Sequence, residues 1–181
     1  MIGLIINLLL GALPECCYYT LFFSCILNLK EKRGKLLTLI FIAYLLFIYA
    51  IPYDILAYFC FSLALYGCLY LLYGKKIQYI DICMSFLAVS YLMITSFVSF
   101  AIFGNQEKYY LFAYVIQRVL LFMPFLFHKK IQNLYQKYRT LWNPYSNKSK
   151  PIKSITLRIL SVIGMCFVCF GMNAFIILIL A

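Results

Sequence analysis

The stretch from Tyr109 to Phe127 carries an arginine near the middle of an apolar segment, and this feature constrains the fold of the chain most. The segment has about the 20 residues that a helix needs to cross a bilayer. Gln117 and Arg118 lie near its centre. An arginine at that depth costs about 3 kcal/mol or more, so it almost always faces other helices and has a partner. The segment therefore predicts a bundle of membrane helices with a polar centre.

Glu15 is the acid that we expect to pair with Arg118. The chain has five acidic residues, and only Glu15 lies at a comparable depth in another apolar segment. Pro14 precedes it, and a proline inside a spanning helix removes a backbone hydrogen bond that neighbouring helices must replace. We predict a buried Glu15–Arg118 pair next to this kink, with Gln117 in the same intramembrane polar site. The pair is either a switch or ligand site, or a fixed tie between helices.

Composition favours an all-α, polytopic membrane protein with one domain over residues 1–181. Of its 181 residues, 66% are hydrophobic and 12% are charged, so a soluble fold would expose too much apolar surface to water. Apolar runs separated by short polar linkers predict about six transmembrane helices. Their expected bounds are residues 2–29, 36–51, 55–73, 77–103, 109–127 and 155–181.

Residues 131–142, in the one long linker, have a different pattern. Their apolar and aromatic side chains recur at helical spacing, and their polar and basic side chains lie away from that face. This pattern is typical of an amphipathic helix that lies in the membrane interface. We therefore expect Lys137, Arg139 and Trp142 to contact the lipid interface.

The basic residues predict the orientation of the chain. They gather in the first, third and fifth linkers, whereas the second linker has none and the fourth has only Lys108. By the positive-inside rule, the odd-numbered linkers face the cytoplasm and both termini lie outside a cytoplasmic membrane. Asp81, one turn inside the fourth span, is expected to be solvated or paired with Lys75 or Lys76. The net charge of +11 then indicates contact with anionic lipid and not with nucleic acid.

The cysteines and the histidine offer few candidates for chemistry. Cys166 and Cys169 form a CxxC in the last span, where small residues that pack between helices are the ordinary expectation. Cys83 and His128 both fall toward the cytoplasmic side, where they would be the nucleophile and base of a membrane cysteine peptidase. No nucleotide-binding, zinc-protease or serine-hydrolase motif is present, and we expect no metal and no cofactor.

Two stretches carry a resemblance to a known family. These are NLLLGALPECCYYTLFFSCILNLKEK near the amino end and KYRTLWNPYSNKSKPIKSITLRILSVIG before the last span. The first is similar to the first helix, and the second to the last linker and helix, of the membrane sensor region of AgrC-like bacterial histidine kinases. The resemblance implies a membrane module that senses or handles peptides.

Three classes of function follow from these patterns. A recognition, sensing or transport subunit without catalytic activity of its own explains the charge pair, the kink and the lack of catalytic motifs. Its partners would be the lipid membrane, a small-molecule or peptide ligand, and another protein or further copies of the chain. The alternatives are a structural or pore-forming subunit of a larger membrane complex and, third, the cysteine peptidase. We favour the first class.

Overall fold

A computed structural model describes residues 7–29, 31–51, 54–78, 81–103 and 110–141, and every element in these ranges is helical. This confirms the all-α prediction for the described part of the chain. The elements are η1 (Asn7–Ala12), α2 (Leu13–Ile26), α3 (Arg33–Tyr44), η2 (Leu45–Tyr49), α4 (Asp54–Tyr73), η3 (Gly74–Lys76), α5 (Asp81–Phe103), α6 (Tyr110–Phe122), η5 (Met123–Phe127) and α7 (His128–Leu141).

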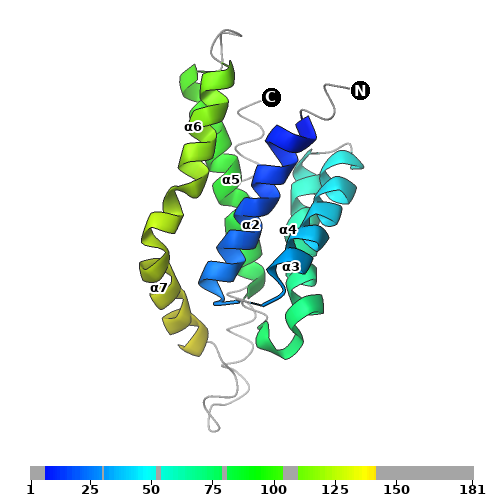
Figure 1. The fold of residues 1–181 in the computed structure, drawn as a ribbon, viewed down its shortest axis with the longest axis vertical. Coiled ribbons are helices and arrows are strands. Elements are labelled where there is room, and N and C mark those ends of the chain that lie inside the picture. The colour runs from blue at the N-terminus through cyan, green and yellow to red at the C-terminus, as the bar shows by residue number, and fades with distance from the viewer. Residues whose placement is uncertain (1–6, 30, 52–53, 79–80, 104–109, 142–181) are drawn as a thin grey trace.

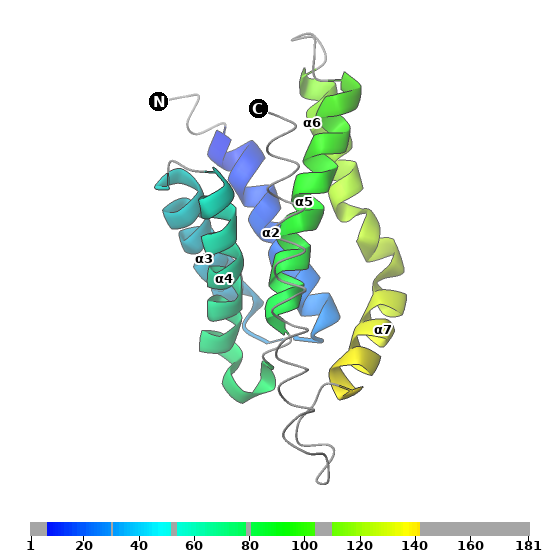
Figure 2. The same cartoon turned by 180° about the vertical axis from the view of Figure 1, so that it is seen from behind.

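Helices α2 to α6 pack side by side in chain order, and α6 returns to contact α2 (Figures 1 and 2). Successive helices run in opposite directions, so the turn from α2 to α3 and the turn after α4 lie at the same end of the bundle. α7 extends from α6 along the bundle toward that end and contacts α2. The sequence predicted that the first, third and fifth linkers lie on the same side of the membrane.

Five predicted spans correspond to helical segments, with ends that differ by a few residues. The sixth, residues 155–181, lies outside the described residues. Two helices, over Leu56–Tyr73 of α4 and Asp81–Ser99 of α5, are long and apolar enough to cross a membrane. Leu10–Ile26 is a shorter apolar helix. The structure thus supports membrane association through α4 and α5, and the count of six spans stays a prediction.

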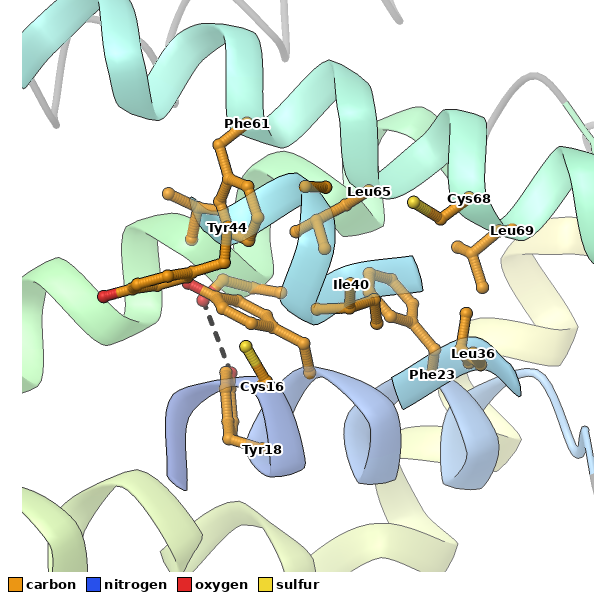
Figure 3. Packing of buried hydrophobic residues seen from close by; sticks show 14 of the residues in the cluster. Cys16, Tyr18, Phe23, Leu36, Ile40, Tyr44, Phe61, Leu65, Cys68 and Leu69 are labelled. Carbon is orange, nitrogen blue, oxygen red and sulfur yellow. Dashed lines mark hydrogen bonds between the residues drawn. The ribbon is translucent and has the colours of Figure 1, made fainter. Parts of the chain in front are cut away.

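The core lies between α2, α3 and α4, where Figure 3 shows side chains from the three helices converging. Phe61 of α4 lies with its ring centroid 5.4 Å from that of Tyr19 on α2 and 5.4 Å from that of Tyr44 on α3. Both contacts are edge-to-face, the arrangement that aromatic rings prefer. This packing holds Tyr44 at the inner side of α2, where its hydroxyl reaches Glu15.

Candidate functional site

The structure places Glu15 and Arg118 in contact, as the sequence predicted. Arg118 Nη2 lies 3.3 Å from Glu15 Oε1, and Arg118 Nη1 lies 3.4 Å from the same oxygen. The side chains are 16% exposed for Arg118 and 11% for Glu15. The pair joins α2 to α6 across more than a hundred residues of sequence. The arginine of one apolar segment is therefore paired with an acid from another apolar segment that is distant in sequence.

Tyr44 completes the partners of Glu15. Its hydroxyl donates a hydrogen bond of 2.8 Å to Glu15 Oε2, so each carboxylate oxygen has a different partner. Tyr44 comes from α3, and Glu15 therefore joins three helices at one point. Sequence reasoning missed this tyrosine, because nothing distinguishes it from the other 16 tyrosines of a chain that has 17.

The start of α2 at Pro14, directly after the π-helical segment η1, is part of the same site. Pro14 has no N–H to donate to the carbonyl of Leu10, four residues earlier. That carbonyl instead accepts hydrogen bonds from the Tyr114 hydroxyl at 2.5 Å and from Arg118 Nη2 at 3.1 Å. Arg118 Nη2 also lies 3.4 Å from the carbonyl of Gly11. The expectation that a neighbouring helix satisfies the freed carbonyl is confirmed, and the side chains that do so come from α6.

Tyr114 also positions the guanidinium of Arg118. It precedes Arg118 by four residues on α6, so the two side chains share a helix face. Arg118 Nη2 donates to the Tyr114 hydroxyl, and the guanidinium carbon lies 4.5 Å from the centroid of the Tyr114 ring. A cation over an aromatic face is attracted by the ring quadrupole. The arginine is thus held by an acid, two carbonyls and an aromatic ring.

Gln117 does not join this cluster. It is buried, and its Nε2 donates a 2.5 Å hydrogen bond to Ser96 Oγ on α5. Adjacent residues on a helix point about 100° apart. Gln117 therefore ties α6 to α5 while Arg118 ties α6 to α2, and the predicted single polar site of three residues is divided between two helix contacts.

An open groove of about 510 Å³ lies next to the charge pair, between the start of α2 and α6. Its lining residues are Leu10, Pro14, Tyr114, Val115, Arg118, Val119 and Phe122. Of the three predicted site residues, Arg118 lines the groove, and Glu15 and Gln117 are not among its lining residues. The surface of the groove is almost entirely apolar, so it can hold an apolar body beside the Glu15–Arg118 pair.

A second polar cluster lies at the other end of the bundle, around Asp81. Asp81 is fully buried, and its Oδ2 accepts hydrogen bonds from the backbone N–H of Gln78 at 2.8 Å and from Arg139 Nη2 at 3.4 Å. Arg139 also donates to the carbonyl of Lys76. The sequence had suggested solvent or a nearby lysine for Asp81. The structure shows instead an arginine that lies 58 residues later in the chain, on α7.

Helix α7 covers residues 131–141 of the predicted amphipathic helix and begins three residues earlier, at His128, but its polar side contacts the bundle. Gln136 Nε2 lies 3.4 Å from the carbonyl of Ile26, and Arg139 bonds to Asp81, so the lipid-interface role expected for Arg139 does not account for its contacts. Lys137 is exposed. Trp142, also expected at the interface, lies outside the described residues.

The candidates for catalysis and metal binding gain no further support. Cys83 is buried on α5, and the Nδ1 atom of His128 lies 2.7 Å from the carbonyl of Phe125. Within the described ranges no group of three or more His, Cys, Asp or Glu side chains could hold a metal ion. Cys166 and Cys169 lie outside the part of the chain that the structure describes.

Comparison with known proteins gives no relative for this chain: no family model, no curated protein and no solved structure matches it.

Proposed function

We propose that this chain is a multi-pass protein of the cytoplasmic membrane that acts as a recognition, sensing or transport subunit without catalytic activity of its own. Six spans and both termini outside are part of this proposal. The observation that carries it is the groove next to Arg118, because a cation inside an apolar segment marks a ligand or ion pathway more often than a surface cation does.

The groove combines three properties of a recognition site. Its walls are almost entirely apolar, its one cation is held in place by several contacts, and one wall is formed by Leu10 and Pro14, where η1 meets α2. Pockets for small ligands usually have this composition, with a few fixed polar groups among apolar side chains. Because the carbonyls before Pro14 are bonded by α6 side chains, a ligand in the groove would lie against the contact between the two helices.

The membrane topology is tested by fusing alkaline phosphatase or green fluorescent protein to truncated chains. Fusions after Lys35, Lys76 and Lys130 are expected to be fluorescent and to lack phosphatase activity, because the basic linkers stay in the cytoplasm. Fusions after Asp54 and Glu107 are expected to give the opposite result. The same reporter active at all five positions would contradict a multi-pass topology.

The recognition function is tested by purifying the full chain from its native membrane in mild detergent and identifying by mass spectrometry what comes with it. We expect a defined small molecule, peptide or partner protein to be retained. Val115→Trp fills the groove without removing a polar contact, and it should lower the retained ligand at least about fivefold. Leu56→Trp, at an exposed apolar position of α4, is the matched control. A protein that brings only bulk lipid would contradict this function.

The structural or pore-forming alternative has its own support in an exposed apolar stripe. Five large apolar side chains along α6 and η5 recur every three or four residues and are each about half or more exposed: Phe112, Val115, Val119, Met123 and Leu126. Such a stripe contacts either lipid or another chain. Retention of many copies of the chain itself in the purification would favour this alternative.

A further inference from the structure

A polar cavity of about 660 Å³ lies at the end of the bundle where α2 and α4 end, and the recognition proposal makes no use of it. It lies between three parts of the chain: residues 27–29 with Glu31, residues 73–78, and α7. Its lining residues are Leu27, Asn28, Leu29, Glu31, Tyr73, Lys76, Gln78, Gln132, Gln136 and Arg139. Polar and charged side chains predominate among them, in contrast to the groove next to Arg118.

The lining supplies donors for an anion from several directions. Lys76 and Arg139 bring two positive charges, and Glu31, which is exposed, brings one negative charge. Within the described ranges Lys76 makes no ion pair, and the side-chain amides of Gln78 and Gln132 make no hydrogen bond to protein. Donors on separate segments suit a tetrahedral phosphate group better than a planar carboxylate, and both arginine and lysine are common phosphate ligands.

The buried charges under the cavity keep Arg139 in place. Asp81 balances the charge of Arg139 from the inner side, while the Lys76 carbonyl accepts a second hydrogen bond from the guanidinium. Of the two cations that line the cavity, Lys76 is therefore the one with no acid of the described chain in direct contact. An anionic ligand would gain most from Lys76 and would be oriented by the fixed guanidinium and the amides.

The position of the cavity favours a ligand from the membrane surface. In the proposed topology this end of the bundle faces the cytoplasm, where the leaflet is rich in anionic lipid. Exposed basic side chains lie close in sequence to the lining residues Glu31 and Gln136, at Lys32, Arg33, Lys35 and Lys137. Basic pockets between membrane helices on this side are known to bind lipid head groups.

We infer that the cavity beneath α7 is a binding site for an organic phosphate, in which Lys76 pairs with the phosphate and Gln78 and Gln132 donate hydrogen bonds to it. The phosphate belongs to the head group of an anionic phospholipid or to a soluble phosphate ester. Of the proposed function, this inference rests on the membrane topology alone and not on the groove next to Arg118.

The test uses native mass spectrometry of the full chain in detergent, titrated with three probes. Dioctanoyl phosphatidylglycerol carries both the phosphate and acyl chains, dioctanoylglycerol carries the chains alone, and glycerol 3-phosphate carries the phosphate alone. We expect the phosphatidylglycerol to bind and dioctanoylglycerol to bind at least about tenfold more weakly. Equal binding of glycerol 3-phosphate and phosphatidylglycerol would support the inference with a soluble ester as the source. Equal binding of dioctanoylglycerol and phosphatidylglycerol would overturn it.

Two matched pairs of variants locate the site. Lys76→Gln should weaken binding of the phosphate probe about tenfold, whereas Lys35→Gln, an exposed lysine that does not line the cavity, should change it less than about twofold. Gln132→Leu should weaken it about threefold or more, and the exposed neighbour Asn133→Leu should not. Equal losses within each pair would show general surface attraction and would overturn the inference. Because the assay does not involve the groove, Val115→Trp should bind these probes normally even if the recognition proposal fails.

Discussion

Replacing Arg118 by alanine is expected to lower the free energy of unfolding by about 3–5 kcal/mol, a large share of the stability of a chain of this size. The change leaves Glu15 buried with its Oε1 atom unpaired. It also removes one of the two side-chain donors to the Leu10 carbonyl and a side-chain donor to the Gly11 carbonyl. In an apolar environment these groups have no water to turn to. We expect a low yield of monodisperse protein in detergent and a lower melting temperature.

The double variant separates the ion pair from other effects of the substitution. Glu15→Ala removes the acid whose charge the arginine balances, so adding it to Arg118→Ala should restore part of the lost stability. A coupling free energy of about 1–3 kcal/mol is expected from denaturant or thermal unfolding of the four proteins in the cycle. Lys35→Ala, at an exposed position, should change stability by less than about 0.5 kcal/mol. Simple addition of the two single losses would mean that the pair contributes nothing specific.

The sequence could predict the Glu15–Arg118 contact because the choice of partners was so small. Acids are few in this chain, and an apolar segment cannot leave an arginine unpaired. Glu15 was the single acid at a depth in its apolar run comparable to that of Arg118, so it was the predicted partner. The helices themselves were predictable for the same reason, since long apolar runs in a membrane satisfy their backbone groups only as helices.

The remaining members of the site depend on rotation about the helix axes, which the sequence does not fix here. Gln117 and Arg118 are adjacent, yet they face α5 and α2 respectively. Apolar side chains occupy all sides of these helices, so no periodic pattern shows which side faces inward. Tyr44 and Tyr114 reach the pair by packing, and their residue type gave no signal among so many tyrosines.

Helix α7 shows a different limit of sequence reasoning. The sequence predicted that this helix lies in the membrane interface, with Lys137 and Arg139 in contact with lipid, because an amphipathic helix beside a membrane usually lies in this way. In the structure Gln132, Gln136 and Arg139 line a polar cavity, while Leu134 is 60% exposed. A polar face packs equally well against water and against a hydrated cavity. The deciding group is Asp81, which lies far from α7 in the sequence.

Replacing Asp81 by asparagine is therefore expected to release α7 from the bundle. The change keeps the size of the side chain but removes the charge opposite Arg139, which is 17% exposed and has its Nε atom buried without a partner in the described structure. It also weakens the hydrogen bond from the backbone N–H of Gln78, because the acceptor is no longer charged. We expect a loss of about 2–3 kcal/mol.

The loss should be local, and hydrogen exchange of the detergent-purified chain measures this directly. α7 is fastened to the bundle mainly by Arg139, by the 3.4 Å hydrogen bond of Gln136 and by the buried ring of Tyr135. Its amides should therefore exchange about tenfold faster or more in Asp81→Asn, while α4 keeps its protection.

Glu31→Gln, an exposed acid of the same cavity, is the matched control and should leave the exchange of the α7 amides unchanged. Adding Arg139→Gln should restore protection, since two neutral amides can hydrogen-bond where a lone guanidinium cannot be balanced. Unchanged exchange in α7, or equal acceleration in all helices, would show that the Asp81–Arg139 pair does not hold this helix in place.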